Sequence, residues 1–134
     1  MIYQYLTSQQ KEPFSWEKNN CLAFVSGYLE HIGQEPLPED WIRGYDNPKS
    51  AWVHYQKTLK KYGCTDIVDA LGIRFHRELT LHPQDGTIVA KKDEDFMGYI
   101  IGLVCSDRCF FMSPEGLKFV EPETSDIYWS IKEC

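Results

Sequence analysis

The sequence predicts an α+β fold in which N-terminal helices pack on a C-terminal antiparallel sheet of about five strands. Two observations lead to this prediction. Apolar residues recur at helical spacing through the first half of the chain, and they alternate with a period of two in the second half, between the turn-forming stretches SDR, SPEG and PETS. No repeat or low-complexity linker interrupts the 134 residues, so we expect one domain over residues 1–134.

Three helices are expected in the first half. The first begins at Asn19 or Asn20, because either side chain can cap the exposed N–H groups of a first turn, and Gly33 is placed to end it. The second covers residues 48–62 and the third residues 65–71, and each is followed by a glycine. The proline-rich stretch QEPLPEDW between the first two helices is expected to be a loop.

Five strands are expected to follow, joined as sequential hairpins. Their ranges are 86–91, 98–105, 108–113, 116–121 and 127–132. Cys105 and Cys109 flank the short turn between the second and third of these strands. We expect two facing free thiols there, because a reducing compartment disfavours a disulfide.

The composition argues against nucleic-acid binding and membrane insertion. A net charge of −6 repels a phosphate backbone, and the nearest basic group, Lys57, Lys60 and Lys61, is expected on a solvated helix face. No stretch approaches the ~20 apolar residues that a membrane span requires. The N-terminal stretch also lacks the apolar segment of a signal peptide.

No metal or cofactor is expected. The five cysteines include no CxxC pair, which argues against a zinc site. The acidic residues 93–95 in KKDEDF lack the alternating ligands and the glycine of a calcium loop, so they are expected at a solvated hairpin tip.

The stretch PFSWEKNNCLAF, residues 13–24, places Cys21 at the first turn of an amphipathic helix. Unpaired N–H groups and the positive end of the helix dipole stabilise a thiolate at such a position, which is how cysteine nucleophiles are activated. A cysteine on an apolar helix face is more often a small buried hydrophobic residue. The residues alone leave both roles open.

The order of several short motifs resembles the NlpC/P60 superfamily of papain-like cysteine peptidases. These motifs are the Trp-x-x-x-Asn-Asn-Cys helix start, the Pro-Gln-Asp-Gly segment that opens a strand, and the glycine-containing strand GYIIGLV. Closer still, the chain resembles short, uncharacterised bacteriophage tail proteins of the DUF6950 type. The motifs shared with that group are PF-x-W, Arg-Gly-Tyr at 43–45, Leu-Gly at 71–72 and Trp-Ser-Ile at 129–131. The resemblance covers about residues 12–132 and implies a papain-like fold.

In active members of the superfamily a cysteine attacks an acyl carbon, commonly in a peptidoglycan peptide, and a histidine on the sheet acts as the base. The resemblance implies that Cys21 is the equivalent of the nucleophile. The position of the base is filled by Ile100, or by Tyr99 if the register slips by one, and no histidine follows residue 82. His82 or His76, in the connection before the sheet, could serve as a displaced base.

The resemblance therefore implies a structural protein of a bacteriophage tail tip or baseplate, with a degenerate NlpC/P60-like fold. Its expected partners are neighbouring tail proteins, and its expected location is the virion, after synthesis in the host cytoplasm. The alternative is an active cysteine hydrolase, a peptidoglycan endopeptidase that aids genome entry. An unrelated small α+β binding domain is the third hypothesis.

Overall fold

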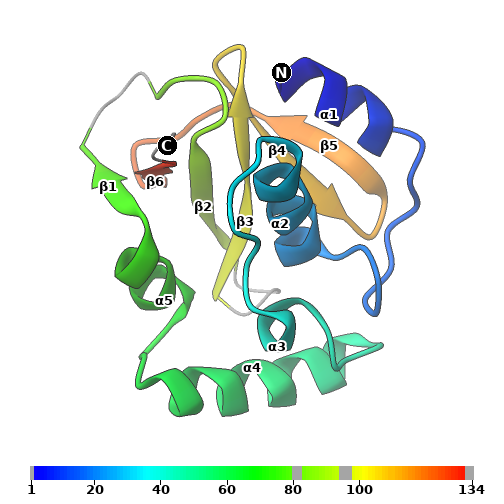
Figure 1. The fold of residues 1–134 in the computed structure, drawn as a ribbon, viewed down its shortest axis with the longest axis vertical. Coiled ribbons are helices and arrows are strands. Elements are labelled where there is room, and N and C mark those ends of the chain that lie inside the picture. Colours follow the sequence, from blue (N-terminus) through cyan, green and yellow to red (C-terminus); the bar gives the residue numbers. More distant parts are fainter. Residues whose placement is uncertain (1, 80–82, 94–97, 132–134) are drawn as a thin grey trace.

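The computed structural model describes residues 2–79, 83–93 and 98–131, and it confirms the α+β class. Within these residues five helices precede six strands, and the helices pack against the sheet (Figure 1). In chain order the elements are α1 (Ile2–Gln9), α2 (Cys21–His31), α3 (Glu39–Ile42), α4 (Pro48–Tyr62), α5 (Ile67–Arg74), β1 (His76–Glu78), β2 (Ile88–Asp93), β3 (Gly98–Cys105), β4 (Arg108–Ser113), β5 (Gly116–Val120) and β6 (Ile127–Ser130).

Asparagine side chains begin the two longest helices. Asn20, rather than its neighbour, caps α2, because its Oδ1 accepts a hydrogen bond from the Ala23 N–H at 2.9 Å. At α4, Asn47 and Ser50 form a reciprocal capping box, and Gly63 ends the helix with a φ of 70°. These local signals place α4 over the predicted range.

The third predicted helix, α5, differs from its expected range at both ends. It begins after the capping residue Asp66 and continues through Gly72 to Arg74. Gly72 does not end the helix, because its backbone lacks the positive φ of a terminating glycine. The chain then passes from α5 through Phe75 directly into β1.

The sequence prediction omits α1, α3 and β1. In α1 the buried residues Ile2, Tyr5 and Leu6 have helical spacing, but the helix has only eight residues. Helix α3 begins inside the stretch that was expected to be a loop, directly after Pro38, and has an acidic first turn that suits the helix dipole. Strand β1 has three residues, too few to show a period.

The sheet is antiparallel throughout its described part, with the strand order β1-β6-β2-β3-β4-β5. Strands β2 to β5 follow one another as predicted, but β6 returns to lie between β1 and β2. The prediction that the five strands follow one another as sequential hairpins is therefore wrong for the last strand, and a sixth strand, β1, joins the sheet. Trp129 of β6 pairs with Ile88 of β2 on one side and with Arg77 of β1 on the other.

Both faces of the sheet bury apolar side chains. Ile101 and Leu103 of β3 belong to the core shared with the helices, whereas Val104 and Phe111 belong to a second cluster on the outer face. Strands β3 and β4 approach closely at Gly102, where an added Cβ would lie 2.1 Å from the Phe110 backbone oxygen.

Cys105 and Cys109 lie on opposite faces of the sheet, so the expectation of facing thiols is wrong. Cys105 pairs with Arg108, and Cys109 pairs with Val104. The turn between them has two residues, both with positive φ, and this tight turn sets the register. Cys105 therefore belongs to the helix-side core and Cys109 to the outer cluster.

Lys91 of β2 binds the segment between β5 and β6 to the outer face of the sheet through ion pairs and a hydrogen bond. Its Nζ lies 2.9 Å from the Asp126 carboxylate and 3.2 Å from that of Glu123, and it donates to the Glu121 carbonyl. The Asp126 side chain is fully buried and that of Lys91 is 12% exposed. Although burial lowers the pKa of Lys91, hydrogen bonds to the two carboxylates raise it overall, so the lysine stays charged.

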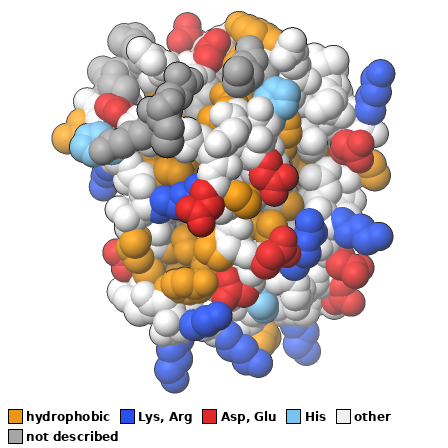
Figure 2. Space-filling model, in the orientation of Figure 1, with side chains coloured by type: hydrophobic (Ala, Val, Ile, Leu, Met, Phe, Trp, Pro, Cys, Tyr) orange, Lys and Arg blue, Asp and Glu red, His pale blue; other side chains and the backbone are white. Residues whose placement is uncertain are grey.

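Basic side chains gather at the lower edge of the molecule, over α4 (Figure 2). The helix carries four lysines and no acidic residue, although the whole chain has a net charge of −6. Lys57, Lys60 and Lys61 are exposed, which confirms their predicted place on a solvated helix face. None of the described helices has the length and apolar character needed to cross a membrane.

Candidate functional site around Cys21

Cys21 is the first residue of α2, and its side chain lies in the core. The residue is 2% exposed, and the backbone N–H of Ile101 in β3 donates a hydrogen bond to its sulfur. Asn20 fixes the entrance to the helix, because its side-chain amide donates to the carbonyls of Trp16 at 3.0 Å and Ile42 at 2.8 Å. The thiol is thus held between the start of α2 and an interior strand of the sheet.

Burial raises the pKa of the Cys21 thiol to about 11. The backbone N–H groups of Ile101 and Leu22 act in the opposite direction, and the carboxylate of Asp93 adds to the increase. Burial therefore outweighs the stabilisation of a thiolate by the start of the helix. At neutral pH the thiol is protonated.

Tyr45 lies near enough to Cys21 for the two side chains to interact electrostatically. Burial raises the pKa of its hydroxyl, and the charge of a Cys21 thiolate would raise it further. The hydroxyl donates to the Trp41 carbonyl at 3.2 Å, and the ring packs on His54 with the ring centroids 5.4 Å apart. His54 in turn hydrogen-bonds through Nε2 to the Asp40 carbonyl. The tyrosine at the thiol is therefore held by both α3 and α4.

The Arg-Gly-Tyr stretch owes its arrangement to contacts on both sides. The Arg43 guanidinium donates to the Glu17 and Lys18 carbonyls, each at 3.4 Å, and so connects this stretch to the loop before α2. Gly44 has a φ of 104°, and a Cβ at this position would lie 2.8 Å from the His54 ring. Only glycine fits here without displacing the imidazole.

The strand position that the resemblance assigns to the base lies in β3, next to the residue whose backbone N–H acts on the Cys21 sulfur. Ile100 and Tyr99 are half-buried, one and two residues before the Ile101 whose N–H reaches the sulfur. The Tyr99 hydroxyl interacts with Tyr55 of α4. Among the described groups that shift the pKa of Cys21 there is no imidazole.

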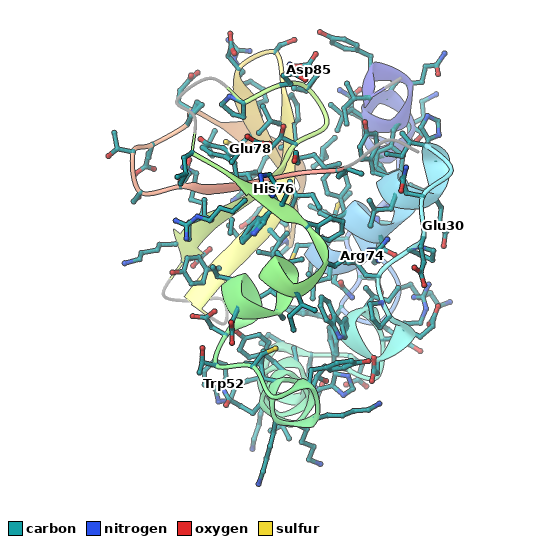
Figure 3. The ribbon with its side chains drawn as sticks, turned by 60° about the vertical axis from the view of Figure 1, so that its left-hand side comes forward. Glu30, Trp52, Arg74, His76, Glu78 and Asp85 are labelled. Carbon is teal, nitrogen blue, oxygen red and sulfur yellow. The ribbon has the colours of Figure 1, made fainter. Side chains whose placement is uncertain are left out.

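The structure places the predicted His76 away from the thiol. His76 is an exposed residue of β1, paired with Ser130 of β6 (Figure 3). Strands β6 and β2 separate β1 from β3, which corresponds to about 14 Å at the usual strand spacing. His82 lies outside the described residues. The structure joins a different histidine, His54, to the site through Tyr45. The position of His54 beside the apolar side of α4 was the signal in the sequence that could have indicated this contact.

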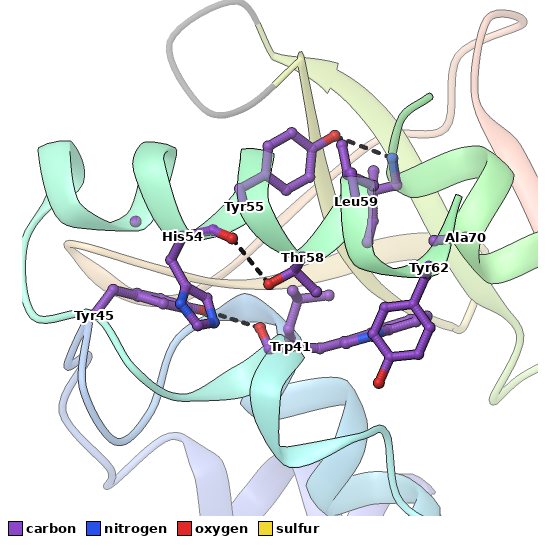
Figure 4. A pocket seen from close by; sticks show the side chains of 11 residues that line it. Trp41, Tyr45, His54, Tyr55, Thr58, Leu59, Tyr62 and Ala70 are labelled. Atoms are coloured by element: carbon purple, nitrogen blue, oxygen red, sulfur yellow. Dashed lines mark hydrogen bonds between the residues drawn. The ribbon is translucent and has the colours of Figure 1, made fainter. Parts of the chain in front are cut away.

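An aromatic cavity of about 20 Å³ lies next to this site, between α3, α4 and α5 (Figure 4). Its walls include the rings of Trp41, Tyr45, Tyr55 and Tyr62. The Nε1–H of Trp41 is buried and has no hydrogen-bond partner among the described residues. The cavity has room for about one water molecule, so it admits no substrate in this conformation.

No three His, Cys, Asp or Glu side chains in the described part of the chain gather closely enough to bind a metal ion. Asp93, the first residue of the acidic run, ends β2 opposite Gly98, and the rest of that run lies outside the described residues. The four described cysteines are free thiols.

Comparisons with known proteins assign the chain to a family without assigning a function. Neither the curated proteins nor the solved structures gave a match. The family model described as a domain of unknown function, DUF6950, matches residues 1–131, nearly the whole chain. The chain therefore belongs to the DUF6950 family.

Proposed function

We propose that the chain is a non-enzymatic structural protein of a bacteriophage tail tip or baseplate, with a degenerate NlpC/P60-like fold. The order of its sequence motifs supports the tail assignment. The chemical state of Cys21 supports the absence of catalysis and is the observation on which this part of the proposal depends.

A cysteine nucleophile must be ionised and must reach its substrate. Cys21 is 2% exposed, and burial raises the pKa of its thiol to about 11, so it meets neither condition in this structure. The nearby strand positions Tyr99 and Ile100 carry a phenol and an aliphatic group in place of an imidazole. A thiol in this state fills space in the core as a small apolar side chain does.

The arrangement of α2 and β3 supports a papain-like ancestry for the domain. The resemblance implies a cysteine at the start of a helix that packs on an antiparallel sheet, and Cys21 has this position relative to Ile101. Under this proposal the fold has kept the geometry of a cysteine peptidase but not its proton acceptor.

Mass spectrometry of purified virions tests the tail assignment, and the protein is expected among the particle components. A phage that carries Cys21→Ala is expected to assemble infectious particles as the parent does. Absence of the protein from intact particles would overturn the tail assignment. Loss of infectivity with Cys21→Ala, while the purified variant folds normally, would overturn the non-enzymatic role.

Alkylation of the native protein tests the state of the thiol directly. Cys64 is only partly buried, so iodoacetamide is expected to modify it before Cys21. Denatured protein, in which both thiols are accessible, provides the control. Faster modification of Cys21 in the native state would favour an enzyme.

The second candidate, an active cysteine hydrolase, is favoured by one observation. The backbone N–H groups of Ile101, Leu22 and Cys21 itself point to the sulfur and would stabilise a thiolate if the site opened. Cleavage of a peptidoglycan muropeptide by the purified protein, and its loss in Cys21→Ala, would establish this activity.

A further inference from the structure

The indole N–H of Trp41 is a buried hydrogen-bond donor that the fold leaves unused. Its Nε1 atom is closed off from solvent and has no acceptor among the described residues. Nearly all buried polar groups in folded proteins have a partner, so a buried donor without one requires an explanation. Trp41 forms part of the wall of the aromatic cavity between α3, α4 and α5. Because the nitrogen is not open to the surface, this cavity is the space from which an acceptor could reach it.

The hydroxyl groups in the cavity wall are already engaged in hydrogen bonds. The Tyr45 hydroxyl donates to the Trp41 carbonyl, and the Tyr55 hydroxyl accepts from the backbone N–H of Ile67 at 3.0 Å. The Thr58 hydroxyl donates within its own helix. A water molecule in the cavity would therefore have the Trp41 N–H as its main partner, whereas buried waters usually make about three hydrogen bonds. An apolar molecule with one acceptor matches this wall better than water does.

An apolar groove lies next to the cavity and opens to solvent. Its volume is about 350 Å³, and its lining includes Pro36, Pro38 and Ile73. Trp41, Tyr62 and Ala70 line both spaces, so these three side chains form the wall between the cavity and the groove. The indole of Trp41 extends towards Tyr62, and the two rings meet edge to face with their centroids 5.7 Å apart (Figure 4). A single layer of side chains thus separates the buried donor from the surface.

Tyr62 is the side chain of this wall that can move. It is the last residue of α4, it is 39% exposed, and Gly63 ends the helix directly after it. Its hydroxyl donates to the Asp40 carboxylate at 3.1 Å, and Lys61 pairs with the same carboxylate at 2.7 Å. Exposed side chains change rotamer within nanoseconds once such a hydrogen bond is broken. Rotation of the Tyr62 ring would join the cavity to the groove and make the Trp41 N–H accessible.

We propose that the cavity and the groove together bind a small aromatic molecule that presents one hydrogen-bond acceptor, such as a carbonyl oxygen, to the Trp41 Nε1–H. Rotation of Tyr62 admits the molecule, and the rings of Tyr45 and Tyr55 pack on its apolar body. The space is sufficient, because a cavity of about 150 Å³ already binds benzene, and the groove alone has about 350 Å³. The indole N–H only donates, so the ligand must supply a lone pair, and a simple cation does not fit. This proposal does not depend on the tail assignment.

Two probes of the same shape test the site by NMR spectroscopy of the wild-type protein. Acetophenone carries a carbonyl group, and in α-methylstyrene a methylene group replaces the oxygen. Each of the four tryptophans gives one indole N–H signal, and the signal of Trp41 is assigned through its bonds to the backbone. Acetophenone is expected to move this signal downfield, as a new hydrogen bond does, and α-methylstyrene is not. A Trp41 signal that acetophenone leaves unmoved at millimolar concentration, or that both probes move equally, would overturn the proposal.

The affinities of variants for the two probes test the donor and the moving ring separately. Trp41→Phe is expected to weaken the binding of acetophenone about fivefold more than that of α-methylstyrene, the effect of one hydrogen bond. Tyr62→Phe, which releases the ring from Asp40, should bind both probes about fivefold more tightly, because the open state is then more populated. Trp52→Phe, at an exposed tryptophan that lines neither space, is the control and should leave both affinities unchanged.

Equal losses for both probes in a Trp41→Phe variant that circular dichroism shows to be folded would overturn the role of the indole donor. If this variant does not fold, the comparison of the two probes on the wild-type protein decides. A Tyr62→Phe variant that binds no more tightly than the wild type would overturn the role of Tyr62 in admitting the ligand.

Discussion

Replacing Asn20 by alanine tests how the start of α2, and with it the position of Cys21, is held. Asn20 is 1% exposed. Its side chain makes three hydrogen bonds, one accepted from the Ala23 N–H and two donated to the Trp16 and Ile42 carbonyls. Alanine removes all three hydrogen bonds, and water cannot replace them at a buried position.

The loss of stability can be estimated from these contacts. Removing an N-cap costs about 1 kcal/mol. Leaving a buried carbonyl without its donor costs about 1–3 kcal/mol, and the lower end applies to the Trp16 carbonyl, which is only partly buried. Asn20→Ala is therefore expected to lower the free energy of unfolding by about 3 kcal/mol. Asn20→Asp keeps the cap but turns a carboxylate towards two carbonyls, so it should be at least as harmful at neutral pH.

Urea denaturation followed by circular dichroism measures this loss. Asn19→Ala is the matched control, because Asn19 donates one exposed hydrogen bond to the Pro13 carbonyl and should lose less than about 1 kcal/mol. Equal, small losses for Asn19→Ala and Asn20→Ala would show that the buried amide does not hold the helix start, and the reasoning would fail.

Three further predictions concern the sheet and the thiols. Gly102→Ala should lower the free energy of unfolding by about 3 kcal/mol, because its Cβ would collide with the backbone of β4, whereas Gly72→Ala, in open space within α5, should raise it by up to about 1 kcal/mol. Lys91→Met should cost about 3 kcal/mol in urea, since it leaves a buried carboxylate unpaired; a neutral result would mean that this carboxylate finds another partner. Burial raises the pKa values of Cys21 and Cys109 from 9.0 to about 11, so the native state holds these two protons more tightly than the unfolded state does. The free energy of unfolding should therefore fall as the pH rises from 9.0 to about 11. Urea midpoints that stay constant over this pH range would contradict the burial of both thiols.

Elements with strong local signals could be predicted from the sequence. The range of α4 is set by Asn47, Ser50 and Gly63, whose preferences act within a few residues of one another. Strands β3 and β4 match their predicted ranges because their period-two pattern is bounded by a tight turn. β1 and the insertion of β6 could not be predicted in this way. A three-residue strand shows no period, and the pairing of Trp129 with Ile88 depends on contacts between distant segments.

The candidate site could be predicted only in part. The sequence placed Cys21 at the start of a helix, and α2 begins there. It did not show how deeply the thiol is buried, which depends on how α2 packs on β3. Nor did it show that Tyr45 and His54 lie next to one another, which depends on how the loop after α3 packs against α4. The Arg-Gly-Tyr stretch was noted as a motif in the sequence. The reason why its central residue is glycine, the lack of room for a Cβ at Gly44, is visible only in three dimensions.

The insertion of β6 between β1 and β2 has a consequence for synthesis on the ribosome. Ile88 of β2 is translated about forty residues before its partner Trp129. Until then β2 has one unpaired edge made of buried, apolar residues, which is the kind of edge that recruits strands from other chains. A nascent chain that stalls between β5 and β6 is therefore expected to aggregate, and a chaperone that shields strand edges would act in this interval.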